Sequence, residues 1–129
     1  MDEIYQEIYK GVDNIISFLS NENIGGSENI VFSVKNSYSD LDEKSIVRIE
    51  FKSGLTTLNG EQYPTSIDGA IVILDEVGGN FEIQIKTSAS KLLIPSLKRL
   101  YDIKAKVGNS VKLVARGKIY ILPDVTNSM

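Results

Sequence analysis

Apolar residues in the N-terminal segment recur at the spacing of an amphipathic helix. They are separated by four, four, three and four positions: Ile4, Ile8, Val12, Ile15 and Leu19. Residues at this spacing share one face of a helix. Asp2 fits the N-cap position, where its side chain can accept a backbone hydrogen bond. The pattern predicts a helix from Asp2 to Ser20 within a segment of residues 1–21, packed either on its own core or on a partner subunit.

Further along the chain, the period changes from about four to two, which is typical of strands with one buried face. The predicted strands are residues 30–35, 47–52, 70–76, 81–86, 111–116 and 118–122. Asn59-Gly60 favours a tight hairpin, because both positions tolerate positive φ. Gly78-Gly79-Asn80 and Val107-Gly108-Asn109 are further turn signals, and Gly117 suggests a turn between the last two strands.

Residues 96–102 follow Pro95, which is tolerated at or before the first turn of a helix, and we expect a short helix there. The sum predicts an α+β fold. In this fold an N-terminal amphipathic helix packs on a mainly antiparallel β-sheet or small β-barrel. The whole chain, 1–129, is expected to form a single domain, with a β-rich body over 29–123 and a frayed tail over 124–129.

Composition narrows the class of protein further. The chain has 129 residues, of which 42% are hydrophobic, and it contains neither cysteine nor histidine. A disulfide framework is therefore excluded, which suits a reducing compartment. The N-terminus lacks the basic start and apolar run of a signal peptide, and no apolar run approaches the length of a membrane helix. From these features we expect a cytoplasmic protein.

The catalytic inventory is thin. Without histidine a serine triad cannot form, and no phosphate-binding loop or nucleophile-elbow motif is present. The acidic loop over 36–44 lacks the spacing and the glycine of a calcium loop. We therefore expect a binding protein that is not an enzyme and that has no metal site and no cofactor.

Charge is distributed unevenly along the sequence. Residues 1–80 contain 5 basic and 14 acidic side chains, a net charge of −9, whereas residues 81–129 contain 9 basic and 3 acidic side chains, a net charge of +6. Such asymmetry favours an anionic partner for the basic part. Alternatively, the two parts complement each other within the fold or between subunits.

The basic part resembles a known DNA-binding family. Residues 86–123 contain Ser90-Lys91-Leu92-Leu93-Ile94-Pro95, then the expected basic helix, the Gly108-Asn109 turn and a hairpin that ends before Pro123. This order is similar to the swapped-hairpin domains of the AbrB/SpoVT type, although serine and lysine replace the family's glycine and arginine. The resemblance implies a dimer with interleaved hairpins. It also implies that Lys91, Lys98 and Arg99 lie near the DNA backbone.

These features predict nucleic-acid binding through the basic C-terminal segment. The candidate binding residues are its lysines and arginines: Lys91, Lys98, Arg99, Lys104, Lys106, Lys112, Arg116 and Lys118. The alternative is a small viral-type structural or assembly subunit, or a protein-binding inhibitor, that uses complementary acidic and basic surfaces. In either case we expect a homo-oligomer whose partner is nucleic acid or another protein, and no membrane association.

Overall fold

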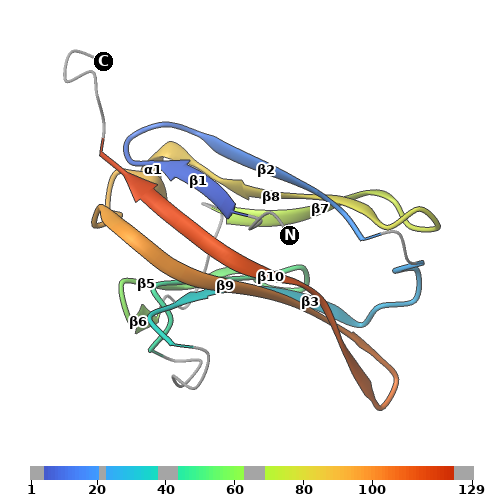
Figure 1. Cartoon of the computed structure of the whole chain (residues 1–129). Coiled ribbons are helices and arrows are strands. Elements are labelled where there is room, and N and C mark those ends of the chain that lie inside the picture. The colour runs from blue at the N-terminus through green and yellow to red at the C-terminus, as the bar shows by residue number, and fades with distance from the viewer. Residues whose placement is uncertain (1–4, 21–22, 38–43, 63–68, 124–129) are drawn as a thin grey trace.

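Two β-sheets pack face to face in the computed structural model, which describes residues 5–20, 23–37, 44–62 and 69–123 (Figure 1). The large sheet contains β1 (Tyr5–Tyr9), β3 (Asn29–Lys35), β4 (Val47–Glu50), β5 (Gly54–Leu58), β6 (Glu61–Gln62), β9 (Ser96–Val107) and β10 (Ser110–Leu122). The small sheet contains β2 (Asn14–Leu19), β7 (Gly69–Asp75) and β8 (Asn80–Ile85). A short helix, α1 (Thr87–Ser90), joins β8 to β9.

The strand order is β1-β10-β9-β3-β4-β5-β6 in the large sheet and β2-β8-β7 in the small sheet. Strand β1 pairs with β10 in parallel, and the other pairings of both sheets are antiparallel. The chain crosses between the sheets several times, so neighbours within a sheet are often distant in sequence. Strands β9 and β10 form a long hairpin whose end projects away from the small sheet (Figure 1).

The core lies between the sheets and includes a line of four aromatic rings. Phe18 of β2 stacks on Phe81 of β8 with ring centroids 5.5 Å apart, and it also contacts Tyr101 of β9 at 5.9 Å. Tyr101 in turn contacts Phe32 of β3 at 6.1 Å. The rings therefore connect two strands of the small sheet to two strands of the large sheet. Around them pack aliphatic side chains, and burial alternates along β2, β4 and β8.

The predicted N-terminal helix is wrong. The described part of that segment forms β1 and β2, joined by a turn at Gly11, whose φ is +89°. Burial in β2 alternates with period two, and two members of the expected apolar stripe, Ile15 and Leu19, are 61% and 60% exposed. Only Ile8 of the described stripe residues is fully buried. β-branched residues favour strands, and the partner strands that complete the pairing lie far away in sequence.

Side chains at the β1–β2 turn fix its shape. Asn14 donates to the carbonyls of Tyr9 (2.8 Å) and Val12 (3.1 Å) and accepts from the Tyr9 backbone N–H (2.8 Å). The buried Ser90 hydroxyl donates to the Val12 carbonyl and accepts from the Gly11 backbone N–H. These bonds connect the turn to α1 and satisfy backbone groups that a helix would have paired internally.

Asp13 connects the same turn to the start of α1, and it makes stability pH-dependent. Hydrogen bonds from the Thr87 hydroxyl (2.8 Å) and backbone N–H (2.7 Å) lower the pKa of the Asp13 carboxyl. A lowered native pKa stabilises the fold above the unfolded pKa of about 3.9, and this contribution is lost as pH falls through the native pKa. We expect Asp13→Asn to lose less stability than the wild type between pH 7 and about pH 3. Urea midpoints at both pH values measure this, and an equal loss in both proteins would contradict it.

The second predicted helix, over 96–102, is also wrong, because these residues begin β9. In β9 the side chains of Tyr101, Ile103 and Ala105 point into the core, and they alternate with side chains that point outward. The expected turn at Gly117 is absent as well, since residues 110–122 form one strand, β10. Over the residues that the structure describes, the fold is therefore β with one four-residue helix, and not α+β.

Other expectations are confirmed. Strands β3, β4, β7 and β8 occur where alternation or an apolar run predicts them. The Asn59-Gly60 hairpin joins β5 to β6, with φ of +53° and +78° at the two turn residues. The tail over 124–129 and most of the acidic loop over 36–44 lie outside the described residues.

Candidate binding groove on the seven-stranded sheet

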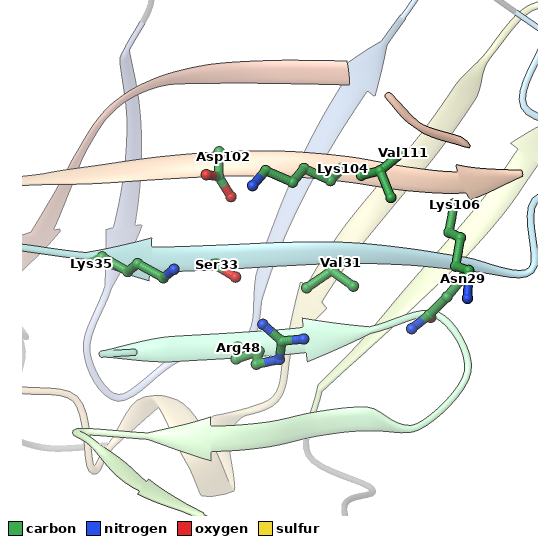
Figure 2. Close-up of a pocket in the computed structure, with 9 residues that line it drawn as sticks. All are labelled: Asn29, Val31, Ser33, Lys35, Arg48, Asp102, Lys104, Lys106 and Val111. Carbon is green, nitrogen blue, oxygen red and sulfur yellow. The ribbon is translucent and has the colours of Figure 1, made fainter. Parts of the chain in front are cut away.

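A groove of about 310 Å³ lies on the outer face of the large sheet (Figure 2). Its lining comes from strands β3, β4, β9 and β10: Asn29, Val31, Ser33, Lys35, Arg48, Asp102, Lys104, Lys106 and Val111. Four of these side chains are cationic and one is a carboxylate, so the lining has a formal charge of +3.

Strand alternation explains why these side chains share one face. On β3 the residues Ile30, Phe32 and Val34 point into the core, so their neighbours point outward. Register then aligns outward residues across the sheet, because paired residues lie on the same face. The rows that result are Arg116–Asp102–Ser33–Arg48, Leu113–Lys104–Val31 and Val111–Lys106–Asn29.

Ser33 and Asp102 form the polar floor of the groove. Their exposed fractions are 3% and 8%, and Lys35 is equally covered at 8%. Figure 2 shows the Lys104 ammonium directed along β9 toward Asp102, and the Lys35 ammonium directed along β3 toward Ser33. The Arg48 guanidinium approaches the same point from β4 (Figure 2). Cations from three strands thus converge around one hydroxyl and one carboxylate.

Hydrogen bonds at the rim hold part of this arrangement in place. Glu50 accepts from the Asn29 amide at 2.8 Å and pairs with Arg48 Nε at 3.3 Å. The Asn29 side-chain oxygen also accepts from the Lys52 backbone N–H at 3.1 Å. Lys106 lies 3.8 Å from the Glu28 carboxylate, and both side chains are more than half exposed. Such an exposed pair contributes little to stability, so Lys106 remains available to a ligand.

Apolar side chains border the groove on the side of the β9–β10 hairpin. Val111 and Leu113 are 65% and 50% exposed, and they lie opposite Lys106 and Lys104 in the register. Val31 adds an apolar surface between the cations on β3 and β9. The site therefore offers charge and apolar contact together, as the centres of protein interfaces do.

The structure brings together only some of the residues predicted from the sequence. Lys104 and Lys106 line the groove, and Arg116 and Lys118 lie on the same face, opposite Asp102 and Leu100. Alternation places Lys98 on this face too, further along β9. Lys112 pairs with Ala105 and so occupies the other face of the hairpin. Lys91 follows α1, and Arg99 lines a separate pocket with Asn59 and Ile94.

Two cations of the groove were missed by sequence reasoning, namely Lys35 and Arg48. Both lie at the polar positions of correctly predicted strands, so alternation alone indicated that their side chains point outward. Their pairing with the C-terminal strand β9 was not visible, since β3 is about 70 positions earlier in the chain. The acidic first part of the sequence thus contributes half of the groove's cations.

Strand order and packing define the class of fold. The arrangement matches the variable-type immunoglobulin sandwich, which consists of two aligned sheets. One sheet has three strands, and the other has the added strands β4 and β5 beside β3. In this scheme β2, β8 and β7 form one sheet, and β10, β9 and β3 form the centre of the other. The chain has an immunoglobulin-like fold.

Comparison with the solved structure of an NK cell receptor supports this assignment. The NK cell receptor NKp44 matches with a TM-score of 0.53 at 10% sequence identity, over 94% of this chain and 99% of that chain. Tim-2 matches with a TM-score of 0.49 at 11% identity, over 98% and 97% of the two chains. No family model matches the sequence, and no curated protein matches it. At such low identity the likeness to NKp44 shows the fold alone.

The aromatic line replaces a hallmark of this fold. Antibody domains join the two sheets by a disulfide packed against a tryptophan, but this chain has neither cysteine nor tryptophan. The Phe18–Tyr101 contact joins β2 to β9, the two strands that the disulfide connects in antibody domains. Here the ring contacts, together with the aliphatic core around them, join the two sheets.

The fold corrects three further expectations. The resemblance to AbrB-type domains is wrong, since β9 occupies the place of the basic helix and the fold matches that of NKp44. DNA binding, which rested on that resemblance and on charge, is withdrawn with it. The expected cytoplasmic location is contradicted too, because the chain matches the structure of NKp44, which is described as an NK cell receptor. Within the described ranges, no helix has the length and hydropathy to cross a membrane.

Proposed function

We propose that this domain is a non-enzymatic protein-binding module that holds an acidic segment of a partner protein in its groove. The observation that carries the proposal is the convergence of Lys35, Arg48, Lys104 and Lys106 on one hollow. A carboxylate placed there meets several cations at once, and charge-assisted hydrogen bonds are stronger than neutral ones. The described residues contain no cluster of acidic side chains that resembles a metal site.

Apolar contact favours a polypeptide as the ligand. Val31, Val111 and Leu113 lie beside the cations, and phosphate recognition alone makes no use of such side chains. A segment that mixes carboxylates with apolar residues would satisfy both parts of the surface. The fold supports the proposal, since NKp44 is described as a receptor and a triggering partner. We place the interaction outside the cell, as this receptor-type fold suggests.

Reversing two groove charges is expected to weaken binding. The probe is a fluorescein-labelled peptide of alternating glutamate and valine, titrated at about 50 mM salt, where charge interactions are only weakly screened. We expect Lys104→Glu/Lys106→Glu to raise the Kd at least about 10-fold, because each variant glutamate replaces an attraction by a repulsion. Fluorescence anisotropy measures the Kd, and circular dichroism checks that the variant is folded.

A matched control distinguishes the groove from general basic charge. Lys91→Glu/Lys112→Glu makes the same change in net charge at two exposed residues of the basic C-terminal part, both outside the groove. We expect its Kd to stay within about 2-fold of the wild type, because Lys112 lies on the opposite face of the hairpin and Lys91 follows α1, so neither side chain contacts a ligand held in the groove. Equal weakening in both variants, or no peptide binding by the wild type, would overturn the proposal.

A further inference from the structure

We infer that the acidic segment bound in the groove is the β7–β8 turn of a second copy of this chain. This inference rests on the proposed function and names the partner of the same site. The turn contains Asp75, Glu76 and Val77 in succession. Both carboxylates are exposed, and Val77 is the most exposed of the large apolar residues described, at 74%.

The turn is held in a defined shape. The Ile24 backbone N–H donates to the Glu76 carbonyl at 2.8 Å, and the Ser20 backbone N–H donates to the Gly79 carbonyl at 3.0 Å. Gly79 has a φ of +73°, and a Cβ at Gly78 would lie 2.6 Å from a carboxylate oxygen of Asp75. The backbone of the β7–β8 turn is thus fixed by hydrogen bonds from Ser20 and Ile24. A ligand already in its bound shape loses less entropy on binding.

Turn and groove complement each other in chemistry. The turn presents two adjacent carboxylates followed by an exposed valine, and the groove presents cations beside exposed Val111 and Leu113. Leu74, which precedes the carboxylates, is also 57% exposed and extends the apolar part of the turn. Opposite charges select the partner and its register, and apolar contact adds buried area.

The contact must form between two molecules. The turn belongs to the small sheet, whereas the groove lies on the outer face of the large sheet, with the core between them (Figure 1). A turn cannot reach the groove of its own chain across this thickness. Each copy therefore offers one turn and one groove, which are different surfaces. Contacts of this kind build rings or open chains, or pair reciprocally.

A charge swap tests the inference. We expect the wild type to self-associate at about 50 mM salt and to dissociate at about 500 mM. Asp75→Lys/Glu76→Lys and Lys104→Glu/Lys106→Glu should each weaken self-association at least about 10-fold, because turn and groove then have the same sign of charge. An equimolar mixture of the two variants should associate again, since each turn meets a groove of opposite charge. Sedimentation velocity measures all of these states.

The matched control is Glu7→Lys/Glu61→Lys, which makes the same charge change at exposed carboxylates on β1 and β6, and it should associate as the wild type does. A wild type that stays monomeric at about 1 mM and low salt, or a mixture that fails to associate, would overturn the inference. If that monomer still binds the glutamate–valine peptide, the proposed function stands without it. If it does not bind the peptide, both proposals fail.

Discussion

Replacing Phe81 by alanine is expected to lower the free energy of unfolding by about 3 to 5 kcal/mol. Phe81 is fully buried on β8 and stacks on Phe18, with ring centroids 5.5 Å apart and planes 19° from parallel. Its removal leaves a cavity next to Phe18 and Tyr101. Among the described aromatic contacts, this pair of rings is the one that connects the small sheet to β9. No covalent bond between the sheets offsets the loss, because the chain has no cysteine.

Urea unfolding followed by circular dichroism measures the change. Phe51→Ala is the matched control, because it makes the same truncation at a ring that is 42% exposed. We expect the control to lose less than about 1 kcal/mol, as is usual for exposed positions. Similar losses in the two variants would show that ring packing between the sheets is not what holds them together.

Asn14→Ala is expected to cost about 2 to 4 kcal/mol of unfolding free energy, since it leaves buried backbone groups without partners. The Asn14 side chain makes three hydrogen bonds at the β1–β2 turn, and it is only 8% exposed. Two of these bonds go to Tyr9, at the end of β1. The substitution should therefore loosen β1 from the rest of the large sheet.

Asn23→Ala provides the comparison for this second variant. Its side chain accepts one hydrogen bond, from the Gly25 backbone N–H at 2.8 Å, at an exposed turn. We expect a loss of about 1 kcal/mol or less. Hydrogen exchange of the β1 amides, read beside urea midpoints, would show whether Asn14→Ala acts locally. If β1 stayed as protected as in the wild type, the role assigned to Asn14 would be wrong.

Strands were predictable wherever local alternation was unambiguous, as in β3, β4 and β8. The N-terminal segment was not, because its isoleucines fit both a helical stripe and the alternation of β2. The choice between them depends on β8 and β10, to which β2 and β1 pair and which lie far along the chain. The segment over 96–102 failed for a similar reason, since Tyr101 is buried by Phe18 and Phe32 from distant strands.

The groove was only half predictable. Charge counting pointed to Lys104 and Lys106, but it also pointed to Lys91 and Lys112, which lie elsewhere. Nothing in the local sequence shows that Lys35 and Lys104 come from neighbouring strands. The absence of cysteine was misleading in another way, because the aromatic contacts joining β2 to β9 make a disulfide unnecessary for this fold.

The parallel pairing of β1 with β10 has a consequence for how the domain forms during synthesis. Tyr5 pairs with Lys118, and Tyr9 pairs with Leu122. Strand β1 therefore leaves the ribosome early but can pair only after β10 has been made. Until β8 and β9 have been made in their turn, the inner face of β3 has neither β9 beside it nor β8 packed over it. Non-local pairing of this kind slows folding and exposes apolar strands to aggregation. We therefore expect β1 to remain unpaired in the nascent chain until β10 has been made.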